Sequence, residues 1–166
     1  MSFRVLKNTL TPAIAKLAQN CHNPTPILQA MGNTLVSMTK RAFNDASLRP
    51  AAWPAVKKSR GAALKQSGAM WQSIRITSLN GNEVRVGTDR PYAPYHQYGT
   101  DPYTISAKMK KMLHWPGARH PVKTVHHPGL PPRPFFPFND SGEMTLLAKD
   151  KVKTAAISAI KKLLPS

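Results

Sequence analysis

Acidic residues, cysteines and long apolar runs are all scarce in this sequence. Seven Asp and Glu stand against 24 Lys and Arg, so the 166 residues carry a formal net charge of +17. The one cysteine, Cys21, cannot form an internal disulfide or a cysteine-rich zinc site, and it fits a reducing compartment. No stretch approaches the roughly 18 apolar residues of a membrane span, and the N-terminus lacks the apolar core of a signal peptide. We therefore expect a protein that is neither exported nor attached to a membrane.

The excess of positive charge predicts an anionic partner, such as DNA, RNA, a lipid face or an acidic protein. The basic residues are spread along the chain rather than gathered into a tail, which indicates a folded and broadly positive surface. A generic solubilising surface would mix both signs. No helix-turn-helix, zinc-finger or ribonucleoprotein motif is present. Any contact with nucleic acid is therefore expected to ignore base sequence and to weaken with salt.

The same scarcity of acids argues against catalysis. Paired carboxylates are hard to assemble from seven acidic residues, and no Gly-x-Ser-x-Gly elbow surrounds a serine. Cys21 carries no nucleophile signature around it. The stretch "GTDRP" lacks the Lys-Ser/Thr pair of a phosphate-binding loop. We expect a protein that is not an enzyme and needs no cofactor, and a hydrolase or metalloprotein is the minor alternative.

Four histidines lie close together in the sequence, and their spacing permits a metal site across a hairpin. They are His114, His120, His126 and His127. Zinc sites normally add cysteine or acidic ligands, which this cluster lacks, and neighbouring residues of a strand point to opposite faces. We interpret the four as loop and interface histidines and expect no metal.

The chain is predicted to form one domain, residues 1–166, with helices near both ends. Residues 1–24 predict an N-terminal helical arm. A long helix over residues 25–46 follows, with Thr25 as its N-cap and Pro26 as its first helical residue. The apolar stripe of this helix consists of Leu28, Met31, Leu35, Met38 and Ala42.

A basic loop and a sheet are predicted to follow the long helix. Residues 47–62 read as the loop, and residues 63–142 hold the sheet. Apolar and polar residues alternate on both sides of Asn80-Gly81, which is a strong hairpin signal, so we predict an antiparallel hairpin at about residues 74–88. Ser67 and Gly68 can break a helix at this point, so that Met70, Trp71 and Ile74 enter the core.

The later part of the sheet region contains an excursion rich in Pro, His and Lys, residues 101–130. Its segments 112–115 and 122–127 form either a second hairpin or a long excursion. Residues 143–164 then predict a C-terminal helix with an apolar stripe of Val152, Ala156, Ala159 and Leu163. The order of elements predicts an α+β fold, in which an antiparallel sheet built around the first hairpin packs against the long N-terminal helix and the C-terminal helix.

The stretch "YAPYHQYGT", residues 92–100, raises the question of whether His96 is a catalytic base, a metal ligand or a structural residue. Without a nucleophile or acidic partners, we interpret the stretch as a rigid turn in which His96 and Gln97 hydrogen-bond loop backbone. Its three tyrosines have large apolar faces with polar tips, which suit interfaces. The predicted interface or loop anchors are Trp53, Tyr92, Tyr95, His96, Tyr98, Arg133, Phe135 and Phe136.

The stretch "HPGLPPRPFFPF", residues 127–138, holds Arg133 between prolines on a stiff, extended path. Phe135, Phe136 and Phe138 then anchor either the sheet of this chain or a neighbouring subunit. The sequence leaves both roles open.

Three stretches in this order resemble one family. They are "LKQSGAMWQSI", "VGTDRPYAPYHQYGT" and "HPGLPPRPFFPF", and Trp53 precedes them. Together they resemble the virion-morphogenesis (tail-completion) family of Mu-like phages, and they are similar to siphophage neck components that join tail to head. The resemblance covers about residues 25–163. The first fifteen or so residues have no clear counterpart, and Asp101–His126 is longer than in short members.

The resemblance implies a structural protein of the virion, assembled in the host cytoplasm, that forms a ring of copies of itself, expected to be sixfold, at the head-proximal end of the tail. Its partners would be neighbouring neck, connector and tail-tube proteins, and packaged DNA in the ring lumen. The positive charge would face that DNA or an acidic neighbour, through Lys57, Lys58, Arg60, Lys108, Lys110 and Lys111. The alternative function is that of a nucleic-acid-binding protein without sequence specificity.

Overall fold

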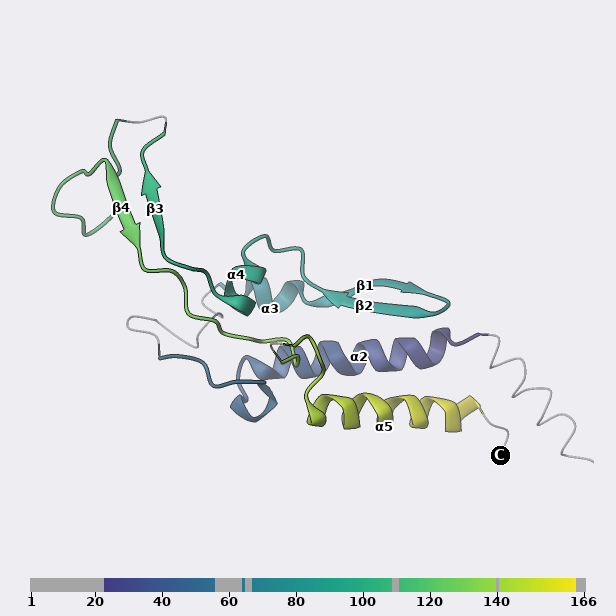
Figure 1. Ribbon diagram of the computed structural model, residues 1–166. Helices are drawn as coiled ribbons and strands as arrows, with labels where there is room; N and C mark the ends of the chain where they lie inside the picture. Colours follow the sequence, from purple (N-terminus) through teal and green to yellow (C-terminus); the bar gives the residue numbers. More distant parts are fainter. Residues whose placement is uncertain (1–22, 56–63, 65–66, 109–110, 140, 164–166) are drawn as a thin grey trace, which may run out of the picture.

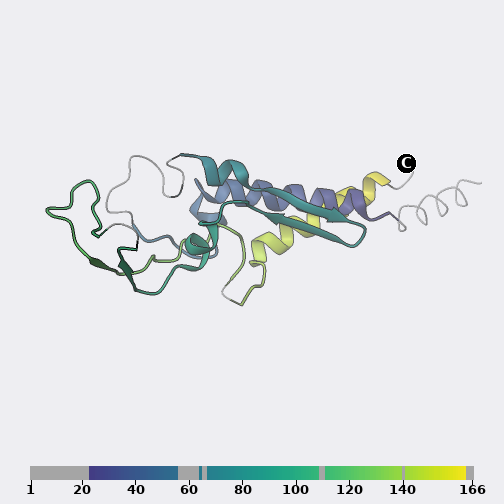
Figure 2. The ribbon, with the colours of Figure 1, turned by 90° about the horizontal axis from the view of Figure 1, so that it is seen from above.

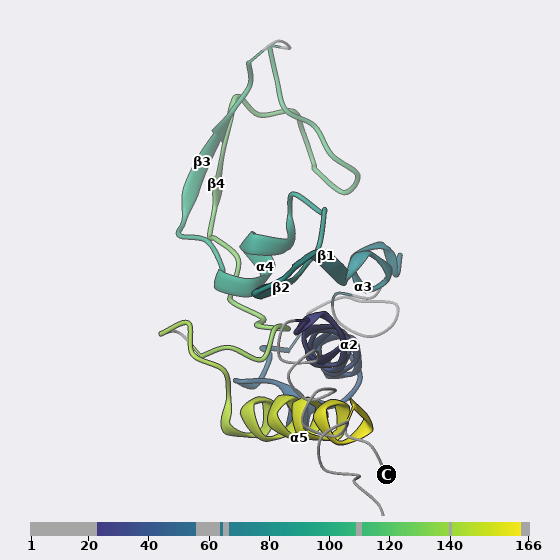
Figure 3. The same cartoon turned by 90° about the vertical axis from the view of Figure 1, so that its right-hand side faces the viewer.

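The computed structural model describes residues 23–55, 64, 67–108, 111–139 and 141–163. Helix α2 (Thr25–Ala42) and helix α5 (Leu146–Leu163) run antiparallel, side by side. A hairpin of strands β1 (Arg75–Asn80) and β2 (Glu83–Gly87) covers the opposite side of α2 (Figure 1). Seen along the helices, the hairpin, α2 and α5 form three successive layers (Figure 3). The predicted α+β class is confirmed.

Helix α2 differs from the prediction at both ends. Pro24 is its N-cap and Thr25 is already helical, so the predicted capping role of Thr25 is wrong. The amide N–H of Thr25 instead donates to the side-chain oxygen of Asn23 at 3.2 Å. The helix ends at Ala42, before the predicted residue 46, because Asp45 accepts from the amide of Ser47 at 3.0 Å and caps a separate turn, η1 (Ala46–Leu48). Side-chain capping by Asp is favoured over helix continuation here.

The first hairpin confirms the sequence prediction closely. Ile76 pairs with Val86, and Asn80 pairs with Glu83. The turn is therefore Gly81-Asn82, one position later than the predicted Asn80-Gly81. The backbone of α2 approaches the hairpin at Gly32, where an added Cβ would lie 2.6 Å from Cγ2 of Val84 and 2.8 Å from Cδ1 of Ile76. The missing side chain lets the sheet pack directly on the helix.

The main apolar core cluster lies at the C-terminal end of α2. Gly68, with φ of 70°, is the N-cap of the short helix α3 (Ala69–Ser73). Met70 and Ile74 are buried as predicted, whereas Trp71 is only half-buried at the edge. The fully enclosed members of this core cluster are Phe43, Met70, Ile74, Ala93 and Phe135.

A second hairpin projects from this body, as Figure 1 shows, and Figure 2 gives its position from above. Strand β3 (Tyr103–Ser106) pairs with β4 (Thr124–His127), and an isolated bridge joins Leu113 to Val122 further out. The segment 122–127 was a correct strand prediction, but its main partner is β3, which the sequence analysis missed. We call residues Tyr103–His127 the arm.

Helix α5 packs on α2, and its buried residues are Ala148 and Val152. Ala156, Ala159 and Leu163 of the predicted stripe are half-buried. The helix begins at Leu146 rather than at residue 143, because the preceding segment forms a bridge between Phe138 and Met144. Within the described residues, none of the helices combines the length and apolarity that a membrane span requires. The predicted N-terminal arm up to residue 22 and residues 56–62 of the predicted basic loop lie outside the described residues.

Candidate interaction surface

The stretch "YAPYHQYGT" forms a short helix, α4 (Ala93–Tyr98), and not the irregular turn that its composition suggested. Pro94 stands in the first helical turn, where its missing N–H costs nothing, and Gly99 ends the helix with φ of 77°. Ala93 and Gln97 point into the protein. The helix therefore has a buried side and a solvent side.

Three tyrosines occupy the solvent side of α4, because residues three apart share one side of a helix. Tyr92, Tyr95 and Tyr98 are 39%, 55% and 78% exposed. We call these three side chains the tyrosine face. Their aromatic rings are the kind of side chain that dominates protein interfaces.

Gln97 fixes the buried side of α4 to residues 127–138, which we call the Arg-Pro-Phe stretch. Its side-chain oxygen accepts hydrogen bonds from the amides of Phe135 and Phe136, both at 3.0 Å. Gln97 is 9% exposed, so these two bonds form away from bulk water. The prediction that Gln97 bonds loop backbone is confirmed, and it connects two stretches that lie far apart in the chain.

His96 bonds the loop backbone through its own backbone and not, as predicted, through its side chain. Its ring Nδ1 is buried and has no hydrogen-bond partner among the described residues, so the predicted side-chain bond to backbone is wrong. It is the backbone carbonyl of His96 that accepts from the amide of Arg133, at 2.7 Å. The ring packs edge-on against Tyr92, with centroids 6.0 Å apart. Burial, together with the nearby charge of Arg133, lowers the pKa of His96.

This lowered pKa predicts a loss of stability in mild acid. The free energy of unfolding should be highest above about pH 6.5, the ordinary histidine value. It should fall below that pH, because the unfolded chain then binds the proton more readily than the folded one. Urea unfolding across pH should show this fall, and His96→Gln should reduce it. His120→Gln, at an exposed ring, is the control and should leave the profile unchanged. An identical profile for His96→Gln would show that another group is responsible.

Trp53 and Arg133 tie the loop after η1 to the same stretch. The indole N–H of Trp53 donates to the carbonyl of Pro134 at 2.8 Å, and the guanidinium of Arg133 donates to the carbonyl of Pro54 at 3.3 Å. The guanidinium carbon of Arg49 lies 3.8 Å from the centre of the indole ring. Both predicted anchors therefore hold this chain together rather than standing free for a partner.

Of the two roles that the sequence left open for the phenylalanines, the structure shows the core role for Phe135. Phe135 is 1% exposed and packs against Phe43, with ring centroids 5.5 Å apart, so it belongs to the core. Phe136 and Phe138 are half-buried, with ring centroids 6.5 Å apart. Phe136 also lines an open cleft.

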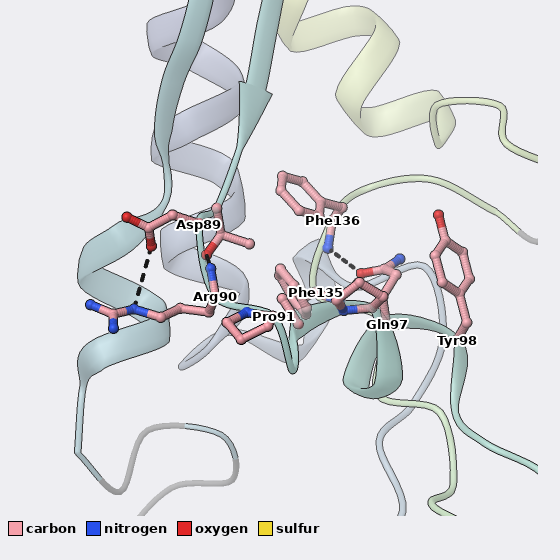
Figure 4. A pocket seen from close by; sticks show the side chains of 10 residues that line it. Asp89, Arg90, Pro91, Gln97, Tyr98, Phe135 and Phe136 are labelled. Carbon is pink, nitrogen blue, oxygen red and sulfur yellow. Dashed lines mark hydrogen bonds and ion pairs between the residues drawn. The ribbon is translucent and has the colours of Figure 1, made fainter.

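That cleft has a volume of about 380 Å³ and lies between the end of β2, α4 and the Arg-Pro-Phe stretch. Figure 4 shows Gln97 reaching the backbone of Phe136 on one side and Asp89 paired with Arg90 on the other. Its lining is Thr88, Asp89, Arg90, Pro91, Ala93, Pro94, Gln97, Tyr98, Phe135 and Phe136. Because Tyr98 belongs to both, the cleft and the tyrosine face form one continuous surface, largely apolar.

The arm is attached to this surface by a tight backbone crossing. Thr100 and Leu130 exchange two backbone hydrogen bonds, of 2.9 and 3.2 Å, directly beside Gly99 and Gly129. Gly129 has φ of 83°. A Cβ at Gly129 would overlap the carbonyl oxygen of Thr100, which belongs to the backbone and has little freedom to move away.

A pair of glycine substitutions separates crowding from backbone strain. Gly117, in the arm, has φ of 93° and open space around it, so Gly117→Ala should cost only the strain of a left-handed residue, about 1–2 kcal/mol. Gly129→Ala should cost the same backbone strain and, in addition, about 1–3 kcal/mol from overpacking against the carbonyl oxygen of Thr100. Hydrogen exchange of the Thr100 and Leu130 amides should therefore accelerate much more in Gly129→Ala. Equal acceleration in both variants would mean that the crossing is not tight.

The predicted basic contacts are placed only in part. Lys108 and Lys111 are exposed in the arm, and Lys57, Lys58, Arg60 and Lys110 lie outside the described residues. Among the residues that the structure describes, no group of three or more His, Cys, Asp or Glu is arranged to hold a metal ion. Tyr103 and Ile105 are not among the predicted contact residues, although their alternation with Thr104 and Ser106 is a strand signal.

Comparison with known proteins places the chain in a family. A model of the phage virion morphogenesis family matches residues 5–149. A relative named Mu-like prophage FluMu G protein 2, from Haemophilus influenzae, is 33% identical over 90 residues. That alignment covers 54% of this chain and 63% of the relative, so the chain matches less than two thirds of the relative's length. No solved structure matches.

The chain therefore belongs to the phage virion morphogenesis family, as the motifs predicted, and it is a tail-related virion protein. The family match begins at residue 5. The expectation that the first fifteen or so residues have no counterpart is therefore wrong for most of them.

Proposed function

We propose that this protein completes the phage tail and joins it to the head, by assembling into a sixfold ring at the neck and binding neighbouring neck, connector or tail-tube proteins. The protein acts by assembly, without catalysis, metal or cofactor. Family membership supports a part in building the virion. The observation that supports the role in head–tail joining is the tyrosine face beside an open apolar cleft. Both are held in place by the junction between α4 and the Arg-Pro-Phe stretch.

The junction gives this surface a fixed shape. Gln97 binds two amides of the Arg-Pro-Phe stretch, and Trp53 binds a third backbone group in it. A surface that is already ordered loses little conformational entropy when a partner binds. Tyrosine adds large contact area with few rotatable bonds. When copies of this chain are arranged around a ring, each copy presents the same surface to its neighbour, so the contacts between successive copies are identical.

In a neck, the positive charge of this chain has two candidate binding partners, DNA and an acidic protein. Lys108 and Lys111 are exposed on the arm, where they would face DNA in the ring lumen or an acidic neighbour. We propose the same contact for Lys57, Lys58, Arg60 and Lys110. Charge reversal of these residues in pairs should block the joining of heads to tails while the monomer stays folded.

Substitution of the tyrosine face tests the assembly role directly. The double variant Tyr95→Ser and Tyr98→Ser should fold normally, because both rings are exposed, but should leave heads and tails unjoined. The measurement is a count of free tails, free heads and whole particles by electron microscopy, in cells that supply only the variant. Leu146→Ser, at an 81% exposed residue of α5, is the matched control and should permit joining. Normal joining by the double variant would contradict the role of this surface.

The alternative is a nucleic-acid-binding protein without sequence specificity, which the charge of +17 favours. A gel shift with DNA over a range of salt concentrations distinguishes the two when the oligomeric state is controlled. Binding by the monomer that falls steeply with salt, combined with normal head–tail joining by the tyrosine variants, would favour the alternative.

A further inference from the structure

The arm is an amphipathic two-stranded hairpin. Tyr103 lies opposite His127, and Ile105 lies opposite Val125. Opposite residues of an antiparallel pair share a face, so these four side chains lie together. The rings of Tyr103 and His127 stack with centroids 4.9 Å apart. We call Tyr103, Ile105, Val125 and His127 the apolar arm face.

The other face of the same hairpin is polar. It carries Thr104 opposite His126 and Ser106 opposite Thr124. The hydroxyl of Thr104 and Nδ1 of His126 lie 3.0 Å apart in a hydrogen bond. A strand pair with one apolar and one polar face is the pattern of a sheet that is buried on one side.

The described part of this chain leaves the β3 side of the apolar arm face open, whereas Val125 and His127 on β4 are half-buried. Tyr103 is 48% exposed and Ile105 is 37% exposed. The principal contacts of β3 and β4 with other helices and strands are with each other, and Figures 1 and 3 show both strands standing away from the body. A two-stranded hairpin by itself is only marginally stable in water. An open apolar face on a hairpin of this kind is suited to contact with another surface.

Charge around the arm identifies the chemistry of that surface. The described arm carries Lys108, Lys111, Arg119 and Lys123, all exposed, and no acidic residue. Complementary charge across an interface guides the encounter and disfavours wrong partners. The surface that covers the arm is thus expected to be acidic around an apolar centre.

A second copy of this chain fits that description poorly. The chain has a net charge of +17, and two of its acidic residues already pair with its own arginines. Glu83 binds Arg85, and Asp89 binds Arg75 and Arg90. Two copies would therefore bring like charges together at the arm.

Nucleic acid fits the charge but not the apolar face. DNA offers mainly phosphate and sugar oxygens to a protein that does not read sequence, and these favour cationic and polar side chains. Ile105 and Val125 would gain nothing from phosphate. Aliphatic side chains in a strand instead favour an apolar protein surface.

We infer that the arm is a docking element whose apolar face binds an acidic protein different from this chain, with Lys and Arg around the contact. This deepens the proposed assembly role, on which it rests for the assignment of that protein as a neighbour in the virion. The tyrosine face then remains available for contacts between copies.

The test uses the purified full-length chain and three labelled probes. These are a peptide of alternating Glu and Val, a polyglutamate peptide of equal charge, and a random-sequence DNA duplex. Fluorescence anisotropy should show that the alternating peptide binds about tenfold more tightly than polyglutamate, because burial of even part of an apolar face is worth this much. Ile105→Ser should remove that preference, and Tyr103→Ser provides a second variant. Circular dichroism checks that each variant folds.

Ile157→Ser is the matched control, since Ile157 is an isoleucine of α5 that is 43% exposed. It should keep the full preference for the alternating peptide. Equal affinities in Ile105→Ser and Ile157→Ser would overturn the inference. DNA binding that is tighter than the binding of both peptides, and that Ile105→Ser weakens, would also overturn it and would identify DNA as the occupant. Loss of self-association in Ile105→Ser would overturn it too and would identify a second copy of this chain as the occupant. This test measures peptide affinity, so it is independent of the head–tail joining test. The peptide test can fail while the tyrosine variants still block joining, and the joining test can fail while the arm still binds the alternating peptide.

Discussion

Phe135→Ala is expected to lower the free energy of unfolding by about 3–5 kcal/mol, the usual cost of deleting a buried aromatic ring. Phe135 is 1% exposed, and its ring lies 5.5 Å from that of Phe43 and 4.9 Å from that of Phe136, measured between centroids. Domains of this size have stabilities of about 5–15 kcal/mol. The substitution should therefore remove a large part of the total, and urea unfolding of the purified chain measures it.

The control for this prediction is Tyr98→Ala. Tyr98 is also aromatic and lies close by in the fold, but it is 78% exposed, so its removal should change the free energy of unfolding by no more than about 0.5 kcal/mol. A small effect of Phe135→Ala, similar to that of Tyr98→Ala, would place Phe135 at an interface between subunits and not in the core of one chain.

Gln97→Leu should destabilise the protein by about 2–5 kcal/mol, because it leaves two enclosed amide groups without an acceptor. The amides are those of Phe135 and Phe136, each 3.0 Å from the side-chain oxygen of Gln97. Leucine has nearly the same volume, so the loss would come from hydrogen bonding rather than from a cavity. The midpoint of urea unfolding should fall, and amide exchange at Phe135 and Phe136 should accelerate.

Gln97→Glu tests the same bonds in the other direction. Glutamate keeps an acceptor oxygen in the place of the glutamine amide oxygen, so it should retain more of the stability than leucine does. If Gln97→Leu and Gln97→Glu destabilise the chain equally, the acceptor is not what connects α4 to the Arg-Pro-Phe stretch. The tyrosine face would then need another explanation for its fixed position.

The features that the sequence predicted well are local. The hairpin of β1 and β2 follows from alternating side chains around a short turn, and the helix of α2 follows from an apolar stripe beginning near Pro26. Gly68 marks the break before α3 because only a residue without Cβ adopts its φ of 70° easily. Each of these signals lies within a few neighbouring residues.

The features that the sequence could not supply depend on contacts between distant stretches. Gln97 binds amides that follow it by more than thirty positions, and no local pattern distinguishes it from His96 beside it. The core position of Phe135 depends on Phe43, far earlier in the chain. Strand β3 is only four residues long, and its partner β4 lies beyond a long loop. The alternation of apolar and polar residues in β3 is therefore a weak signal within a segment rich in proline and histidine.

The same contacts connect the fold with the proposed role. Gln97, Trp53 and the backbone of His96 fix α4 against the Arg-Pro-Phe stretch, which keeps the three tyrosines and the cleft at one place on the surface. The arm leaves the body directly after α4, through the crossing at Gly99 and Gly129. The two proposed interaction elements are thus set by one junction, which suits a protein whose work is to position its neighbours.

The central claim, a ring at the neck, is tested most directly by locating the chain in assembled particles. A small tag fused to the chain and labelled with gold should appear in electron micrographs at the head-proximal end of the tail, and averaged images should show a sixfold ring there. Whole particles with the label elsewhere on the tail, or with no label at all, would contradict the account.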